Sequence, residues 1–66
     1  MRKVKAKDFS RWTWSEWPAV SNSQRFGQAF YNRFAVLNRW EFMPKLFYMT
    51  DTKEAQWFII ENLLEE

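Results

Sequence analysis

The chain is organised around a helical pattern near its middle, between residues 22 and 37. Apolar side chains recur there every three or four residues and form one stripe. Its members are Phe26, Phe30, Phe34 and Leu37. Ser21 or Asn22 can cap this helix, since a short side-chain oxygen accepts a bond from an unpaired amide of the first turn. The pattern therefore predicts a central helix that starts near Ser23.

The end of the central helix has two interpretations. Asn38 is a suitable left-handed cap, which would end the helix there. The period also continues through Phe42, which would add one turn before Pro44 stops it. We place the end between residues 38 and 42. Pro44 fits the first position of a helical turn, so residues 44–48 are predicted to form a single turn, with a short strand as the alternative.

A second and a third helix flank the central one. Asp8 stands as the N-cap of the first helix, near residues 8–17. This helix ends at Trp17 because Pro18 disfavours helical geometry at the residue before it. Asp51, with Glu54 three residues later, opens a helix from Thr52 to about Leu64. The apolar positions of this last helix form two stripes: Ala55, Phe58, Ile59 and Leu63, and beside them Trp57, Ile60 and Leu64. So wide an apolar surface predicts contacts with two elements, one of them the central helix, with Phe58 facing Phe30.

The predicted fold is therefore all-α, a single small three-helix domain over residues 1–66. Its helices are expected near residues 8–17, 23–38 and 51–64, with an irregular or single-turn segment at 39–50. Residues 1–7 alternate charge with Val4 and Ala6 and fit a short edge strand or a flexible basic arm, of which we favour the arm.

Gly27 lies inside the central helix, where glycine costs about 1 kcal/mol relative to alanine. Such a glycine indicates that another backbone or a large ring approaches the helix closely. Because the chain has five Trp, two Tyr and seven Phe, we expect a ring.

The composition argues against catalysis and metal binding. The chain contains no Cys and no His, and its acids are placed as helix caps or on solvated faces, so we predict no enzyme activity, no cofactor and no metal. Residues 1–5 carry charge where a secretory signal has an apolar core, and no apolar run is long enough to span a membrane. We expect a cytoplasmic protein and leave homo-oligomerisation open.

Two groups of side chains are candidates for binding a partner protein. Arg25, Gln28 and Asn32 form a polar row on the central helix that could grip a partner or brace neighbouring loops. Five Trp exceed what so small a core holds, so Trp12, Trp14 and Trp40 are candidates for a surface patch, with at least one of them exposed beside an Arg.

The charge is unevenly distributed along the chain, which bears on whether nucleic acid is the partner. Residues 1–45 carry nine Lys or Arg against three acids, a net charge of +6, and residues 46–66 carry −4. A basic first half rich in Trp suggests a polyanion, whereas the acidic second half would repel one, so the charge by itself favours neither nucleic acid nor protein. The residues that would bind nucleic acid in this alternative are Arg2, Lys3, Lys5, Lys7 and Arg11, together with the exposed Trp.

Residues 25–32, Arg-Phe-Gly-Gln-Ala-Phe-Tyr-Asn, and the later Leu46-Phe47-Tyr48 with Asp51 also carry a resemblance. They resemble a group of small phage and prophage proteins that have an R-(F/Y)-G-Q-A-(F/L)-x-N core and a later L-F-Y-x-x-D segment. The resemblance covers residues 17–60 or so. It implies a phage or integrated-element gene, and it carries no biochemical function.

The sequence predicts a non-enzymatic phage or mobile-element protein that binds a host or phage protein through an aromatic and Arg surface. The alternative is a nucleic-acid-binding protein that uses the basic N-terminal residues and exposed Trp. A structural role in the virion is a third hypothesis.

Overall fold

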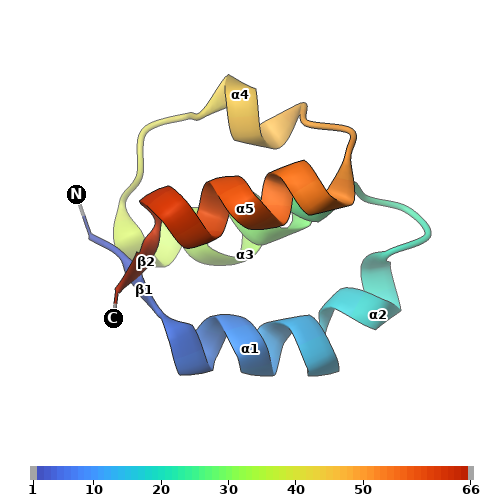
Figure 1. The fold of residues 1–66 in the computed structure, drawn as a ribbon, viewed down its shortest axis with the longest axis horizontal. Coiled ribbons are helices and arrows are strands. Elements are labelled where there is room, and N and C mark those ends of the chain that lie inside the picture. Colours follow the sequence, from blue (N-terminus) through green and yellow to red (C-terminus); the bar gives the residue numbers. More distant parts are fainter. Residues whose placement is uncertain (1, 66) are drawn as a thin grey trace.

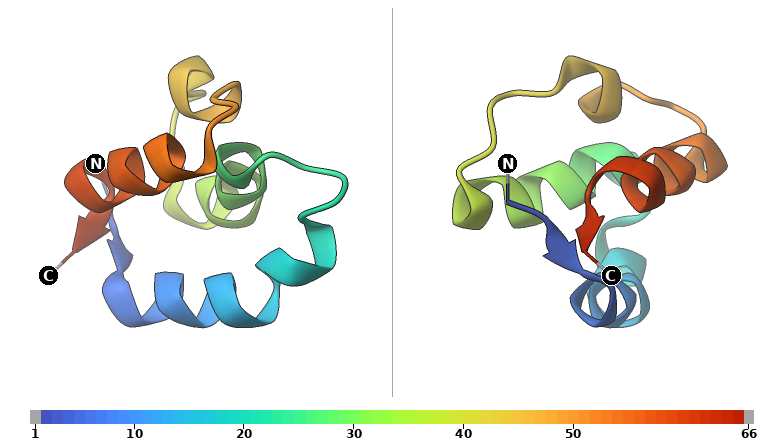
Figure 2. Two further views of the ribbon diagram at one scale, coloured as in Figure 1. Left: turned by 45° about the vertical axis from the view of Figure 1, so that its right-hand side comes forward. Right: turned by 60° about the vertical axis from the view of Figure 1, so that its left-hand side comes forward.

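The structure, a computed structural model, describes residues 2–65, and its longest element is α3 (Phe26–Asn38). Figure 1 shows α3 and α5 side by side in the middle of the molecule, with α1 and α2 along one side and α4 along the other. The two further views in Figure 2 show the same order of layers. The remaining elements are β1 (Val4–Lys5), α1 (Ala6–Ser15), α2 (Trp17–Val20), α4 (Pro44–Phe47), α5 (Thr52–Asn62) and β2 (Leu64–Glu65).

The core is built around Phe30, whose side chain has no exposed surface. Four rings surround it, with centroids 4.8 Å away at Phe34, 5.6 Å at Phe9, and 5.8 Å at both Trp12 and Trp40. Phe9 and Trp12 come from α1, while Trp40 follows α3. This cluster therefore holds the first helix and the segment after α3 against the central helix.

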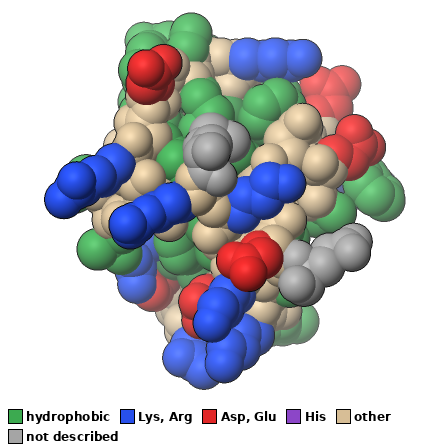
Figure 3. Space-filling model, turned by 90° about the vertical axis from the view of Figure 1, so that its left-hand side faces the viewer, with side chains coloured by type: hydrophobic (Ala, Val, Ile, Leu, Met, Phe, Trp, Pro, Cys, Tyr) green, Lys and Arg blue, Asp and Glu red, His purple; other side chains and the backbone are tan. Residues whose placement is uncertain are grey.

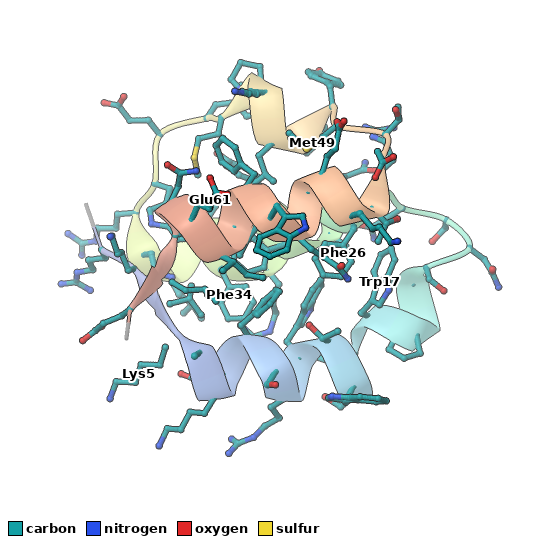
Figure 4. The ribbon with its side chains drawn as sticks, viewed as in Figure 1. Lys5, Trp17, Phe26, Phe34, Met49 and Glu61 are labelled. Carbon is teal, nitrogen blue, oxygen red and sulfur yellow. The ribbon has the colours of Figure 1, made fainter. Side chains whose placement is uncertain are left out.

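A second set of rings closes the end of the core nearest α2. Trp17 of α2 meets Phe26 of α3 edge to face, with centroids 4.9 Å apart. Figure 4 shows Phe26 and Phe34 between α3 and α1. The side of the core next to α5 is filled by Ala55 and Ile59, which are completely buried.

The prediction that Phe58 faces Phe30 is wrong. Phe58 is only partly buried, and its ring lies beneath the Lys45 ammonium, 5.5 Å from Nζ. Ile59 is the side chain that α5 buries completely at this level. The rest of the predicted first stripe is confirmed, since Ala55, Ile59 and Leu63 are buried. Of the second predicted stripe, Trp57 and Ile60 are exposed.

The structure is mostly helical, as predicted, but the three-helix architecture is wrong in detail. The described residues contain five helical segments and a parallel pair of two-residue strands. The first predicted helix, 8–17, is divided: α1 starts at Ala6 and ends at Ser15, and Trp17 opens α2. Pro18 is tolerated in α2 because it lies in the first turn, where its missing N–H has no intrahelical acceptor.

The other helix boundaries are closer to the prediction. The central helix starts at Phe26, three residues later than predicted, because Arg25 is extended and occupies the cap position. It ends at Asn38, the earlier of the two predicted ends, since Arg39 adopts the left-handed conformation with φ of 55°. Residues Pro44–Phe47 form the predicted single turn.

The N-terminal residues form the short strand, the interpretation that we favoured less. Val4 pairs with Leu64 and Lys5 with Glu65 in parallel register, and the Val4 amide donates to the Leu63 carbonyl at 2.8 Å. Val4 is 4% exposed. Residues 4 and 5 are thus paired with the other end of the chain, and residues 6 and 7 belong to α1.

The predicted Asp51 cap is confirmed, because Asp51 Oδ1 accepts a bond from the Glu54 amide at 3.0 Å. Asp51→Ala is expected to destabilise the protein by about 1 kcal/mol, since a first-turn amide loses its acceptor. For a domain of this size, this loss lowers the melting temperature by about 4–8 °C. Thermal denaturation followed by circular dichroism measures the change. Asp51→Asn keeps an acceptor oxygen and should melt close to the wild type, whereas equal losses in both variants would contradict the cap.

The surface area is that expected of a monomeric domain. The structure exposes 4796 Å², against about 4,500 Å² expected for a monomer of this mass. The chain therefore buries as much of itself as other proteins of its size do. No helix within residues 2–65 is both long enough and apolar enough to cross a lipid bilayer.

Candidate interaction surface

The first turn of α3 and the single turn of α4 are joined through Arg25. Its guanidinium donates from both Nε and Nη2 to the Phe47 carbonyl, each over 3.3 Å. The same guanidinium lies 5.9 Å from the ring centroid of Phe47 and 5.7 Å from that of Tyr48. Arg25 therefore fixes both the backbone and the rings of the α4 region.

Gly27 permits this close contact between α3 and α4. A Cβ atom at residue 27 would overlap the Leu46 carbonyl oxygen and would lie 3.0 Å from Leu46 Cδ1. The close approach indicated by the sequence is thus real, but the neighbour is backbone and not the expected ring. A ring could rotate away from a new side chain, whereas a carbonyl oxygen of α4 can move only with its helix.

Gln28 and Asn32, the other members of the predicted polar row, also make bonds within the chain. Gln28 Oε1 accepts from the Arg25 amide at 3.3 Å, and Asn32 Nδ2 donates to Gln24 Oε1 at 3.2 Å. Asn32 is exposed, while Arg25 and Gln28 are partly buried. The bonds of Arg25 brace the chain around Tyr48, one of the two roles considered for this row. Whether the row also contacts a partner stays a prediction.

A cluster of four rings lies on the surface beside Arg25. We call it the α4 aromatic surface, and it consists of Tyr31, Phe42, Phe47 and Tyr48. Five pairs of these rings meet edge to face, with centroids between 5.1 and 6.2 Å apart. Phe42 is 53% exposed and Tyr48 is 61% exposed, so the cluster presents aromatic surface to solvent. Sequence analysis missed it, because its members come from the central helix and from residues 42–48, which we predicted only as part of an irregular or single-turn segment.

The candidate Trp residues are separated by the fold. Trp12 and Trp40 are 3% and 8% exposed, and Trp40 Nε1 donates to the Arg2 carbonyl at 2.7 Å. These two side chains are part of the core and cannot form the predicted surface patch. Trp14 is 83% exposed, so one indole does face solvent as predicted, but among the described residues no Arg lies over its ring. Trp57, which was not a candidate, is 61% exposed.

The basic residues of the nucleic-acid hypothesis are all exposed. Four of them line one groove between the N-terminal residues and α3, namely Lys3, Lys5, Lys7 and Arg11. Arg2 is not part of the groove lining, and its carbonyl accepts the hydrogen bond from Trp40 Nε1. Arg33 of α3 is a fifth cation in the groove that sequence analysis missed.

The sequence matches no known protein family, and no curated protein or solved structure is detectably similar to it.

Proposed function

We propose that this chain is a non-enzymatic interaction protein of a phage or mobile element, and that it binds a segment of another protein on the α4 aromatic surface beside Arg25. The exposure of Phe42 and Tyr48 next to a fixed guanidinium carries the proposal. Tyr, Phe and Arg are enriched at the centres of protein interfaces, where aromatic side chains bury a large area with few rotatable bonds. The phage or mobile-element origin is supported by the sequence resemblance.

The surface is held in place before any partner arrives. Arg25 binds the Phe47 carbonyl, and the close approach at Gly27 fixes α4 against α3. Each ring of the surface touches at least two others. A surface that is already ordered loses little conformational entropy on binding, so more of the contact energy contributes to affinity.

The charges beside the rings suggest the chemistry of the bound segment. Arg25 Nη1 has no acceptor among residues 2–65, while Nε and Nη2 are occupied by Phe47. We therefore expect a segment with a large apolar side chain on the rings and a carboxylate close to Arg25, since guanidinium groups pair with carboxylates.

Selection of a displayed random-peptide library on the wild-type protein tests this proposal. We expect the selected peptides to share an aromatic or aliphatic residue next to Asp or Glu. The double variant Phe42→Ala, Tyr48→Ala should bind them more weakly by about 2 kcal/mol, or roughly 30-fold, as truncation of hot-spot side chains does. Fluorescence polarisation with a labelled peptide measures this difference.

Val36→Ala is the matched control, because Val36 is 83% exposed and lies outside the aromatic surface. It should bind the peptides as tightly as the wild type does. All three proteins should melt cooperatively, which separates a lost contact from a lost fold. Peptides that bind the double variant as well as the wild type would overturn the proposed surface.

A further inference from the structure

A groove of about 590 Å³ runs between the N-terminal part of the chain and the C-terminal half of α3. One wall carries Lys3, Lys5, Lys7 and Arg11, and the facing wall carries Arg33. Figure 3 looks onto the side of the molecule that holds the N- and C-terminal ends, and Lys and Arg side chains project over it with Asp and Glu between them. In Figure 4 Lys5 points outward beside the start of α1. The pairing of β1 with β2 fixes the backbone that carries Lys5.

The acids of the groove are fewer than its cations. Asp8, Glu16 and Glu65 line it, so the five cations and three acids together give the groove a net charge of +2. Glu16 is already paired, since Arg33 Nε lies 3.2 Å from its Oε1. Glu65 stands opposite Lys5 in the strand register. The remaining basic side chains of the groove are those of Lys3, Lys7 and Arg11. They are exposed and make no ion pair among residues 2–65.

An exposed indole stands at the end of this basic row. Lys7, Arg11 and Trp14 share one face of α1, because they are spaced four and then three residues apart. Along the helix axis, Arg11 lies about 6 Å from Lys7, and Trp14 lies about 10 Å from it. Trp14 is 83% exposed and has no ring partner among the described residues. An indole so exposed gives nothing to the core. It offers a flat face for stacking next to side chains that attract phosphate.

We infer that this groove and the exposed face of α1 beside it bind single-stranded nucleic acid. Phosphates would lie along Lys3, Lys5, Lys7 and Arg11, and a base would stack on Trp14, which lies on α1 just outside the groove lining. A single strand is favoured over a duplex because only unpaired bases present their faces for stacking. The site is separate from the α4 aromatic surface, so either proposal can fail alone.

Fluorescence polarisation of a labelled oligothymidine, in DNA and RNA forms, is the primary test. Four phosphate contacts predict a slope of about −3 in log K against log salt, so affinity should fall about 50-fold between 50 and 200 mM salt. Lys7→Gln with Arg11→Gln should bring that slope to about −1.4, because each lost contact removes about 0.7. Glu65→Gln should tighten binding, since it removes an acid from the groove.

The indole is tested separately from the charges. Trp14→Ala should weaken binding about 5- to 150-fold without changing the salt slope, as loss of one stacked base does. Trp57→Ala is the matched control, because Trp57 is also exposed but lies on α5, away from the basic row of α1. It should leave the affinity unchanged. The melting curves of both variants should match that of the wild type.

Several results would overturn the inference. Absence of binding at low salt would do so, as would equal losses for Trp14→Ala and Trp57→Ala. Equal affinity for a duplex of the same length would contradict the stacked base. If heparin, which has no bases, competes as well as oligothymidine and Trp14→Ala has no effect, the groove is a general polyanion site and not a nucleic-acid site.

Discussion

Phe30→Ala is expected to remove the cooperative unfolding transition, or to leave it only at low temperature. Phe30 is completely buried, and four rings from three parts of the chain pack on it. Truncating a buried Phe costs about 3–5 kcal/mol, because the transfer energy is lost and a cavity remains. A domain of 66 residues has a total stability of about 3–10 kcal/mol. Urea denaturation followed by far-UV circular dichroism measures the loss.

Phe42→Ala is the control for this prediction. It removes the same atoms from a ring that is 53% exposed, so its destabilisation should be much smaller. If Phe30→Ala unfolded at the same urea concentration as Phe42→Ala, the packing of α1 and Trp40 around α3 would be wrong.

Gly27→Ala is expected to destabilise the protein by about 2 kcal/mol or more, the cost of overpacking a tight contact. Helix propensity alone predicts the opposite, a gain of about 1 kcal/mol. The sign is decided by the Leu46 carbonyl, which the new methyl group would overlap. To relieve the overlap, α4 must move away from α3, which would weaken the Arg25 bonds to Phe47 and expose Leu46, now completely buried.

Asn32→Ala provides a control on the same helix, at an exposed position where no overlap arises. Its effect should stay within about 0.5 kcal/mol, as for most surface substitutions. Thermal and urea denaturation of both variants give the comparison. A Gly27→Ala protein as stable as the wild type would show that α4 does not rest on α3.

Features that depend on neighbouring residues were predictable from the sequence. The Asp51 cap, the turn at Pro44 and the burial of Phe26, Phe30 and Phe34 follow from local hydrogen bonding and from the helical period. Leu37, the fourth member of the predicted stripe, is 64% exposed. The end of the first helix near Pro18 was expected, but the sequence could not show that a second short helix would begin there. The candidate interaction residues were less predictable. Arg25 was found as a member of a row, whereas three of the four rings of the α4 aromatic surface come from residues 42–48, for which the sequence indicated only an irregular or single-turn segment.

Contacts between distant parts of the chain were decided only by the tertiary structure. Alternation at residues 2–7 fits a strand or an arm, and we favoured the arm. The strand forms because Leu64, sixty residues away, lies where Val4 can pair with it. The five Trp have the same hydrophobicity, yet Trp12 and Trp40 are buried while Trp14 and Trp57 face solvent. The sequence by itself determined which segments are helical and where several of them end, because those interactions span four residues or fewer. Which face of each helix meets another element, and so which rings are left for a partner, depends on packing between segments that only the folded chain brings together.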